Sequence, residues 1–224
     1  MPTHTVIVAD DHPLFREALG LALRQALGDI AIIEAGDMDE LQASVCNEAA
    51  ADLVLLDLHM PGVQGFSALV YLRAHHPEIP VCLVSANNNP VVVHRALDHG
   101  AAAFIPKSAS VGEISKVLET VLAGDIWQPA ESDARGSAGD ELDIAQRLGG
   151  LTPQQFRVLM MLADGLLNKQ IAFELGISEA TVKAHMTAIF RKLEVINRTQ
   201  AVLLLNQLSI DSPEQAASAF QSAT

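Results

Sequence analysis

The first 124 residues alternate between short apolar runs and stretches whose apolar residues recur at helical spacing. Each apolar run is rich in branched side chains and ends after a few residues, which is typical of a buried strand. The five runs are HTVIVAD, IAIIEAG, LVLLD, PVCLVSA and AAAFIPK. The first helical stretch begins at Pro13, with apolar positions at Leu14, Ala18, Leu21 and Ala22. The other four are MDELQASVCNEAA, FSALVYLRAHH, PVVVHRALDHG and VGEISKVLETVLAG.

Strands and helices that alternate in this way predict a parallel sheet covered by helices on both faces. Because the connections between parallel strands are right-handed, the pattern favours a flavodoxin-like, doubly wound α/β domain of five strands over residues 1–124.

After residue 124 the periodicity stops. Residues 125–147 mix Ser, Gly, Asp and Ala and are predicted to be a linker, with residues 131–140 its flexible part. Leu142, Ile144 and Leu148 are spaced for a short helix that leads into a second domain. The last residues, 211–224, are rich in Ser and Ala and are expected to be a frayed, disordered tail.

Polar residues stand where the predicted strands end. Asp10 and Asp11 follow the first strand, Asp57 ends the third, Ser85 ends the fourth, and Lys107 follows the fifth. In an open parallel sheet, ligands bind beyond the carboxyl ends of the strands, so these side chains are expected to lie together.

The chemistry of this set indicates a phosphoryl site. Crowded carboxylates repel one another and need a cation, and their hard oxygens suit Mg²⁺, which also bridges to phosphate. A lysine and a hydroxyl supply a charge and a donor for an anion. Asp57 would be the nucleophile that forms an aspartyl phosphate. The position of Asp57 at a strand end does not by itself decide against a simpler alternative, in which Asp57 only caps a turn.

Residues 148–210 are predicted to form a small all-α domain. Thr152, with Pro153 and Gln155 after it, is typical of a helix start, and Asn168 is expected to cap a second helix that ends at Gly176. Ser178 is expected to cap a third helix. A helix, a short glycine turn and a second capped helix indicate a helix-turn-helix.

In the third of these helices the apolar stripe is Val182, Ile189, Phe190 and Leu193, and the other face carries polar residues. In a helix-turn-helix this helix enters the major groove of double-stranded DNA with its amino end first, near Lys183. A plain helical bundle with a solvated face is the alternative.

The charge differs between the two parts. Residues 1–150 hold 8 Lys and Arg against 21 Asp and Glu, whereas residues 151–210 hold 6 against 4. The first part repels nucleic acid and the second can approach it.

Two cysteines, Cys46 and Cys82, have no metal-type spacing and are expected to be small, reduced core residues. No apolar run approaches the ~18 residues that cross a membrane, and the start lacks the features of a signal peptide, so a cytoplasmic protein is expected.

The acidic pair, LLDLHMPG, VSA and the FIPK lysine resemble, in order and spacing, the receiver domain of two-component response regulators over residues 4–124. The resemblance implies phosphorylation by a histidine kinase. It implies Mg²⁺ ligands from Asp10, Asp11, Asp57 and the backbone carbonyl of His59, with switch roles for Ser85, Phe104 and Lys107.

The chain differs from many receivers in having Ser108, not proline, after Lys107. Positions 59 and 87 are, by the resemblance, those that tune the lifetime of the phosphate. The His59 side chain is expected to point to solvent. The other histidines without ligand spacing are expected at the surface: His12, His75, His76, His94 and His99.

The segments LTP, NKQIA, LGIS, TVKAH and RKL are similar to the LuxR-type DNA-binding domain found in the NarL/FixJ response regulators. The resemblance implies that the last helix, Thr199 to Leu208, pairs subunits into a homodimer, although it can instead pack within its own domain. It also implies base contacts from Lys183, Ala184 and Thr187 and phosphate contacts from Lys169, Thr181 and Arg191.

The hypothesis is a cytoplasmic transcriptional regulator that is switched by phosphorylation of Asp57 and is no enzyme beyond phosphorylating and dephosphorylating itself. One alternative is a metal-dependent phosphohydrolase, although His59 stands where such enzymes place a second aspartate. Another is a DNA-binding or scaffold protein that works without phosphate.

Overall fold

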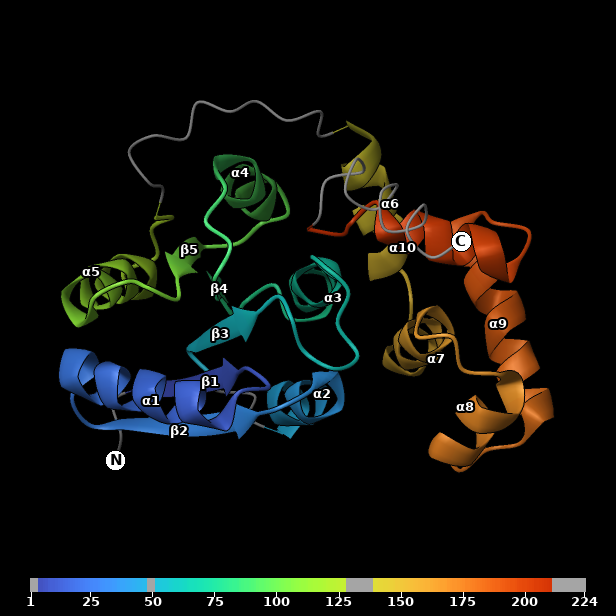
Figure 1. Ribbon diagram of the computed structural model, residues 1–224, viewed down its shortest axis with the longest axis horizontal. Coiled ribbons are helices and arrows are strands. Elements are labelled where there is room, and N and C mark those ends of the chain that lie inside the picture. Colours follow the sequence, from blue (N-terminus) through green and yellow to red (C-terminus); the bar gives the residue numbers. More distant parts are fainter. Residues whose placement is uncertain (1–3, 48–50, 128–138, 211–224) are drawn as a thin grey trace, which may run out of the picture.

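The computed structural model describes residues 4–47, 51–127 and 139–210. These residues form a sheet domain with its covering helices, followed by a smaller helical domain (Figure 1). The predicted tail, 211–224, and most of the predicted flexible stretch, 131–138, lie outside the described residues.

The sheet has five parallel strands in the order β2-β1-β3-β4-β5. This order confirms the predicted doubly wound fold and puts β3 at the centre, where both of its faces are buried. Val8 pairs with Leu55, and Leu55 pairs with Cys82. The strands are β1 (His4–Ala9), β2 (Ile30–Ala35), β3 (Leu53–Asp57), β4 (Val81–Ser85) and β5 (Ala103–Pro106).

Helices cover both faces of the sheet. Successive side chains of a strand point to opposite faces, so Leu55 faces the layer of α1 and α5, whereas Leu56 faces the layer of α2, α3 and α4. These helices are α1 (Pro13–Leu27), α2 (Met38–Asn47), α3 (Ser67–His75), α4 (Pro90–Asp98) and α5 (Val111–Leu122).

Helix α1 buries a different stripe from the one that the sequence suggests. Among the four apolar positions at helical spacing, Ala22 is buried, but Leu14 is 83% exposed and Leu21 is 65% exposed. Ala18 is exposed as well. The core is instead contacted by the adjoining positions Leu19 and Leu23, because only one side of this helix can face the sheet.

The helical domain contains α6 (Gly139–Gly149), α7 (Pro153–Ala163), α8 (Asn168–Glu174), α9 (Glu179–Leu193) and α10 (Arg198–Asn206). The cap predicted at Thr152 is present: the Gln155 backbone N–H donates to its hydroxyl and the Gln155 side chain accepts from its N–H. Ser178 caps α9, and Gly176, at φ 62°, makes the turn between α8 and α9.

Two helix starts differ from the predictions. Asn168 is the first residue of α8 and not its cap, because the Gln170 side chain already accepts from the Leu167 backbone N–H at 2.7 Å. Helix α10 begins before Thr199: the Asn197 side chain accepts from the Gln200 N–H at 2.9 Å and caps it.

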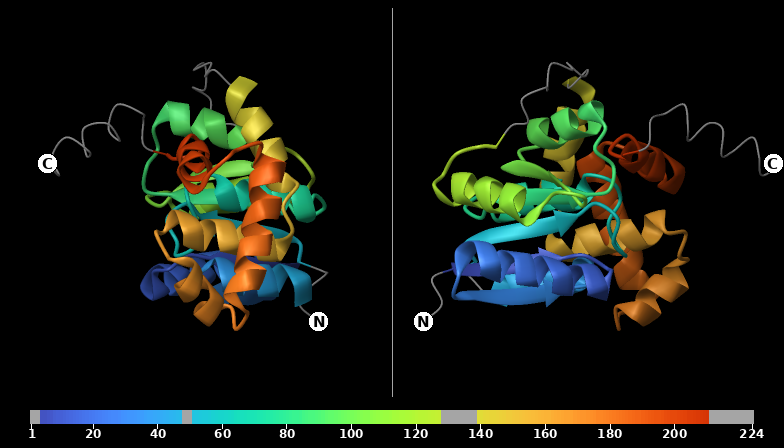
Figure 2. Two further views of the ribbon diagram at one scale, coloured as in Figure 1. Left: turned by 90° about the vertical axis from the view of Figure 1, so that its right-hand side faces the viewer. Right: turned by 60° about the vertical axis from the view of Figure 1, so that its left-hand side comes forward.

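The two domains share one hydrophobic core. Helix α6 begins within the range predicted as a linker, which ends at residue 147, and continues to Gly149. It packs against α3 of the sheet domain. A Cβ at Gly149 would lie 2.8 Å from the Ala74 Cβ, so glycine permits this close approach. Two further views show the helical domain against the side of the sheet domain that carries α2 and α3 (Figure 2).

Candidate functional site

Two buried carboxylates and a lysine meet at the carboxyl end of the sheet. Asp10 follows β1, Asp57 ends β3, and each is 2% exposed. The Lys107 ammonium, just after β5, lies 2.6 Å from Asp10 Oδ2 and 2.9 Å from Asp57 Oδ2. The structure therefore brings together three residues that are far apart in sequence.

Burial sets the electrostatics of this group. Desolvation raises the pKa of Asp57, although the hydrogen bond and charge of Lys107 offset part of the effect. For Lys107, burial lowers the pKa, but the bonds to Asp10 and Asp57 outweigh it and raise the pKa overall. Lys107 is therefore a fixed positive charge beside a carboxylate whose ionised form is disfavoured until more positive charge arrives.

The cluster has the donors that a divalent cation needs. Asp10, Asp11, His12 and Asp57 each offer one ligand atom, and these atoms all lie within 4.8 Å of one another. The Oδ1 atom of Asp57 is buried and has no hydrogen-bond partner among the described residues. An orphaned, buried carboxylate oxygen fits a bound cation or a transferred group.

Ser85 and Phe104 lie near this end of the sheet. Ser85 is fully buried, and its hydroxyl accepts from the Asn87 backbone N–H at 3.1 Å. Phe104, on β5, is 2% exposed and packs into the core beneath α4. No peptide bond in the described residues is cis, so Lys107–Ser108 is trans.

The approach to Asp57 is an open cavity of about 420 Å³. The exposed side chains of His59 and Leu14 stand at its edge, and the outward direction of His59 confirms the sequence prediction. The lining residues are His12, Leu14, Phe15, Asp57, His59, Ala86 and Lys107.

Three histidines that were predicted as surface residues take part in specific contacts. The His12 ring nitrogen Nδ1 lies 2.5 Å from Asp11 Oδ1 and 3.2 Å from Asp10 Oδ1. His75 is hydrogen-bonded to the Leu151 carbonyl at 2.9 Å, and the His99 side chain is 1% exposed. The predicted surface position holds for His12, whose side chain is 65% exposed, whereas His75 is partly buried and the prediction for His99 is wrong. Packing between elements far apart in the chain, which buries His99, leaves no local pattern.

The buried histidines belong to the junction of the two domains. Desolvation lowers the pKa of His75 and the pKa of His99. A carboxylate oxygen of Glu141, on α6, lies 3.3 Å from His99 Nε2 and offsets part of the shift of the His99 pKa. Burial therefore disfavours the charged form of both rings at the interface.

The segment after α10 is fastened to the sheet domain. The Leu208 carbonyl accepts from the Phe66 N–H at 3.1 Å, and a Cβ at Gly65 would lie 2.0 Å from that carbonyl oxygen. Arg95 of α4 donates to the carbonyls of Gln207 and Ser209, each at 2.9 Å. Residues 207–210 are called the latch below.

The latch lies next to the loop that follows Asp57. Ser209 and Ile210 of the latch line one side of a cavity of about 330 Å³. Its other side is lined by Asp11, His59 and Gly65. A structural change at Asp11 or at the loop after Asp57 would therefore act close to the residues that follow α10.

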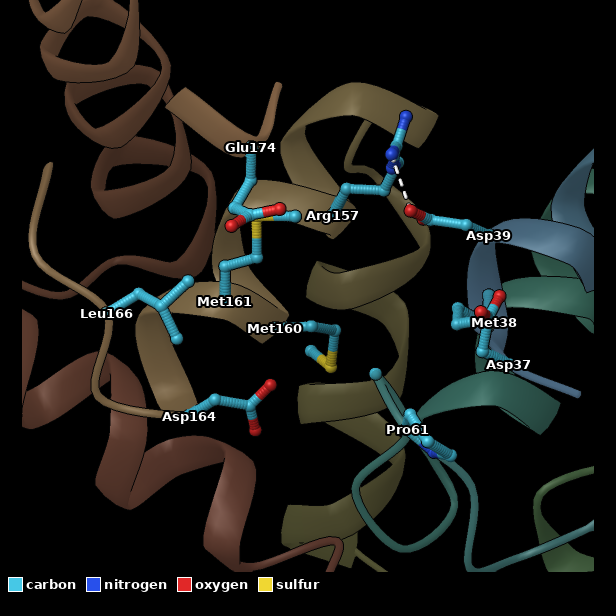
Figure 3. Close-up of a pocket in the computed structure, with 11 residues that line it drawn as sticks. Asp37, Met38, Asp39, Pro61, Arg157, Met160, Met161, Asp164, Leu166 and Glu174 are labelled. Atoms are coloured by element: carbon cyan, nitrogen blue, oxygen red, sulfur yellow. Dashed lines mark hydrogen bonds and ion pairs between the residues drawn. The ribbon is translucent and has the colours of Figure 1, made fainter. Parts of the chain in front are cut away.

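A second junction cavity, of about 250 Å³, separates α2 and the Pro61 turn from α7 (Figure 3). Met160 and Met161 project into it from α7, and Arg157 crosses to Asp39 with an N–O distance of 2.5 Å (Figure 3). This edge of the interface therefore combines a cavity with an ion pair between the two domains.

The outer face of α9 is open. Helix α7 lies between α9 and the sheet domain, so α9 is on the far side of the molecule (Figures 1 and 2). Val182, Ile189 and Leu193 are buried as predicted, while Phe190 is only partly buried. The six residues predicted to contact DNA are all exposed: Lys169, Thr181, Lys183, Ala184, Thr187 and Arg191.

Two family models match the chain, one in each domain. Residues 6–119 match the response regulator receiver domain, and residues 150–205 match the bacterial regulatory proteins of the luxR family. The "Probable transcriptional regulatory protein NarL" of Mycobacterium tuberculosis is 34% identical over 202 residues, which are 88% of this chain and 91% of that protein. This chain belongs to the NarL-type response regulators.

Other relatives of this response regulator are also transcriptional proteins. The "Glycerol metabolism activator" of Pseudomonas putida is 39% identical over 89% of this chain and 94% of its own length. The "Nitrate/nitrite response regulator protein NarL" of Escherichia coli K12 is 30% identical over 91% and 95%. The chain is accordingly a DNA-binding transcriptional regulator of the two-component class, not a typical enzyme.

Solved structures agree on the fold of the response regulator. RcsB from Salmonella typhimurium superposes with a TM-score of 0.54 at 24% identity, over 92% of this chain and 99% of RcsB. The signal receiver domain of NarL from Mycobacterium tuberculosis gives 0.50 at 34% identity, over 55% and 99%. In the described part of the chain, no helix combines the length and the apolar character that a membrane span requires.

Proposed function

We propose that Asp57 accepts a phosphoryl group from a histidine kinase and that this modification controls how the second domain binds DNA. An oxygen of Asp57 attacks the phosphorus of the donor, a P–O bond forms, the P–N bond to the donor imidazole breaks, and that nitrogen keeps its electron pair. The observation that supports this role most directly is the unpartnered, buried Oδ1 of Asp57 beside Lys107.

The residues around Asp57 support the transfer. Asp10, Asp11, Asp57 and the carbonyl of His59 would hold Mg²⁺, which when bound neutralises charge on the transferred group. Lys107 is already positioned to donate to a phosphoryl oxygen. The same residues account for the proposed self-phosphorylation from a small phosphodonor and for later hydrolysis of the aspartyl phosphate.

Ser85 and Phe104 would carry the change away from Asp57. The Ser85 hydroxyl, which accepts from the Asn87 N–H, would turn to donate its proton to a phosphoryl oxygen. Space then opens above Phe104, whose ring lies in the core under α4. Such a shift would move α4, which carries Arg95 and thereby holds the latch.

The kinase would dock on α1. Leu14, Ala18 and Leu21 form an exposed apolar stripe at helical spacing, and Leu14 also lines the cavity over Asp57. A protein seated on this stripe would bring its phosphohistidine to the mouth of that cavity. Apolar contact at the stripe would supply affinity, since burying one Leu side chain gives about 1.5 to 3 kcal/mol.

The open face of α9 would bind double-stranded DNA. Lys183, Ala184 and Thr187 would reach base edges in the major groove, while Lys169, Thr181 and Arg191 would contact phosphates. Because the proposed target is chromosomal DNA, the protein would act in the cytoplasm. A homodimer through α10, where Leu203 is 57% exposed, would present two such helices to two half-sites.

Control would act through the latch and not by covering α9. The proposed DNA contacts are exposed while residues 207–210 are bound to the sheet domain, so docking leaves the reading face free but ties down the end of α10. Release of the latch on phosphorylation would free α10 for pairing.

Genome-wide footprinting with and without a beryllofluoride phosphate mimic tests this proposal. We expect occupancy at a set of promoters to rise with the mimic in the wild type and to stay low in Asp57→Asn. Equal occupancy in all samples would contradict the switch and favour a regulator that works without phosphate. Multiple turnover of small phosphate esters would instead support a phosphohydrolase.

A further inference from the structure

We propose that the His12 imidazole binds the divalent ion of the acidic cluster directly, so that the pocket prefers first-row transition ions such as Mn²⁺ and Ni²⁺ to Mg²⁺. The inference rests on the proposed function of the pocket and adds a nitrogen to its oxygen ligands. His12 directly follows Asp10 and Asp11 in the sequence, and the fold turns its ring toward both carboxylates.

The position of the ring is suited to ligation. Nδ1 of His12 lies 2.5 Å from Asp11 Oδ1 and 3.2 Å from Asp10 Oδ1. Neighbouring ligands of an octahedral ion with bonds of about 2.1 Å lie about 3 Å apart, so these separations bracket the value for donors around one ion. The ligand atom of Asp57 belongs to the same group, within 4.8 Å of the others.

Asp57 gives independent evidence that a ligand belongs here. Its side chain is 2% exposed, Oδ2 is bonded to Lys107, and Oδ1 is buried without a hydrogen-bond partner in the described residues. Burial of an unpaired carboxylate oxygen is costly, and a cation shared with Asp10, Asp11 and His12 would remove that cost.

The polar contacts of the His12 ring with the described residues are to Asp10 and Asp11, which are themselves candidate ligands of the ion. His12 occupies the cap position of α1, but its side chain makes no capping hydrogen bond. Its backbone N–H donates to Asp10 Oδ1 at 2.8 Å, and ring Nδ1 is also within hydrogen-bonding distance of that oxygen, at 3.2 Å. The ring lines the open cavity over Asp57, so an ion can reach it from solvent.

The donor set determines the preference. Mg²⁺ favours oxygen ligands and keeps its waters, whereas a neutral imidazole favours the later first-row ions, with Ni²⁺ above Mn²⁺ in the usual order of affinity. The pocket of Asp10, Asp11, Asp57 and His12 is therefore a mixed oxygen and nitrogen site.

Pulsed electron paramagnetic resonance of Mn²⁺ bound to the full chain tests direct contact. We expect nuclear modulation from a nitrogen in the wild type and its loss in His12→Phe, which keeps a ring but no nitrogen. His94→Phe, a change of the same kind on α4 away from the cluster, should keep the signal. His12→Gln serves as a second variant, and circular dichroism checks that each one folds.

Calorimetric titration with NiCl₂ and MgCl₂ tests the preference. In His12→Phe we expect Ni²⁺ affinity to fall about tenfold or more, the size typical of losing a group that supports a metal, while Mg²⁺ affinity changes less than about twofold. An absence of nitrogen modulation, an absence of Mn²⁺ binding, or an equal loss for both ions would overturn the inference.

Failure of this inference can be told from failure of the proposed function. A chain that is phosphorylated on Asp57 with Mg²⁺ but shows no nitrogen modulation loses only the role of His12. A chain that shows the modulation but accepts no phosphoryl group keeps the role of His12 and loses the proposed function.

Discussion

The pocket at Asp57 and the outer face of α9 are built in opposite ways. The pocket is assembled from three strand ends, its two main carboxylates are buried, and Lys107 is already bonded to both. The face of α9 comes from one helix and is exposed, and within the described residues the side chains of Lys183 and Arg191 on it make no hydrogen bond. The first region is pre-assembled for chemistry, and the second is free to adapt to a partner.

This difference bears on how phosphorylation would control DNA binding. The proposed DNA contacts are exposed in the described structure, so the proposed control would not need to uncover α9. The element that connects the two regions is the latch, which is held by Phe66 and Arg95 next to the loop after Asp57.

The largest expected effect comes from Gly65→Ala. Its Cβ would lie 2.0 Å from the Leu208 carbonyl oxygen, so the latch must leave the sheet domain. We expect a more extended particle in small-angle scattering and DNA affinity without phosphate that rises about 5- to 150-fold, the usual range for coupled sites.

Gly124→Ala is the matched control for Gly65→Ala. It also has a positive φ, 95°, but nothing lies within 4 Å of its Cβ position. It should share the backbone strain and keep the compact shape. Equal scattering curves for both variants would show that the latch does not hold the domains together.

Lys183→Ala should weaken DNA binding without changing phosphorylation. Loss of a contact to a base edge costs about 1 to 3 kcal/mol, which is about 5- to 150-fold in affinity. Lys116→Ala on α5 removes the same charge from an exposed position of the sheet domain and should change affinity little. Fluorescence anisotropy with a footprinted promoter fragment measures both, and a similar loss in both variants would indicate only a general charge effect.

Asp57→Asn should stabilise the protein at neutral pH when no divalent ion is present. Because the pKa of Asp57 is raised by burial, its ionisation costs stability, and this cost appears as the pH rises from the usual value of 3.8 through the folded-state pKa. We expect the variant to be more stable by about 1 kcal/mol at pH 8 and no more stable at pH 4.

Urea denaturation in EDTA at the two pH values measures this difference. Added Mg²⁺ should stabilise the wild type more than the variant, since the ion compensates the buried charge. A variant that is less stable than the wild type at pH 8 would mean that the bond to Lys107 outweighs desolvation.

The smallest effect is expected for Arg157→Ala, which removes the bridge to Asp39 at the polar edge of the junction. Both partners are partly exposed, and such pairs contribute about 0 to 1 kcal/mol. Arg95→Ala should loosen the domains more, because Arg95 bonds Glu141 and two latch carbonyls. Hydrogen exchange at α10 compares the two, and a larger change in Arg157→Ala would contradict this ranking.

The sheet and the acidic cluster could be predicted because their signals are local. An apolar run that ends in Asp57 gives both a strand and the end of that strand, and the parallel fold brings such ends together. The helix caps at Thr152 and Ser178 could be predicted for the same reason, since a capping bond joins residues only three positions apart.

What could not be predicted depends on packing between distant parts. Contacts with α6 and its neighbours cover His75 and His99. The exposed side of α1 could be identified only from the structure, in which Leu19 and Leu23 face the sheet. The fold also turns the ring of His12 toward the acidic pair that it follows in the sequence.

Intact mass of the purified chain after incubation with acetyl phosphate and Mg²⁺ tests whether Asp57 is the phosphoacceptor. We expect the mass of one phosphoryl group on the wild type, at Asp57, and none on Asp57→Asn. An unchanged wild-type mass, under conditions in which a control receiver gains its adduct, would contradict this assignment.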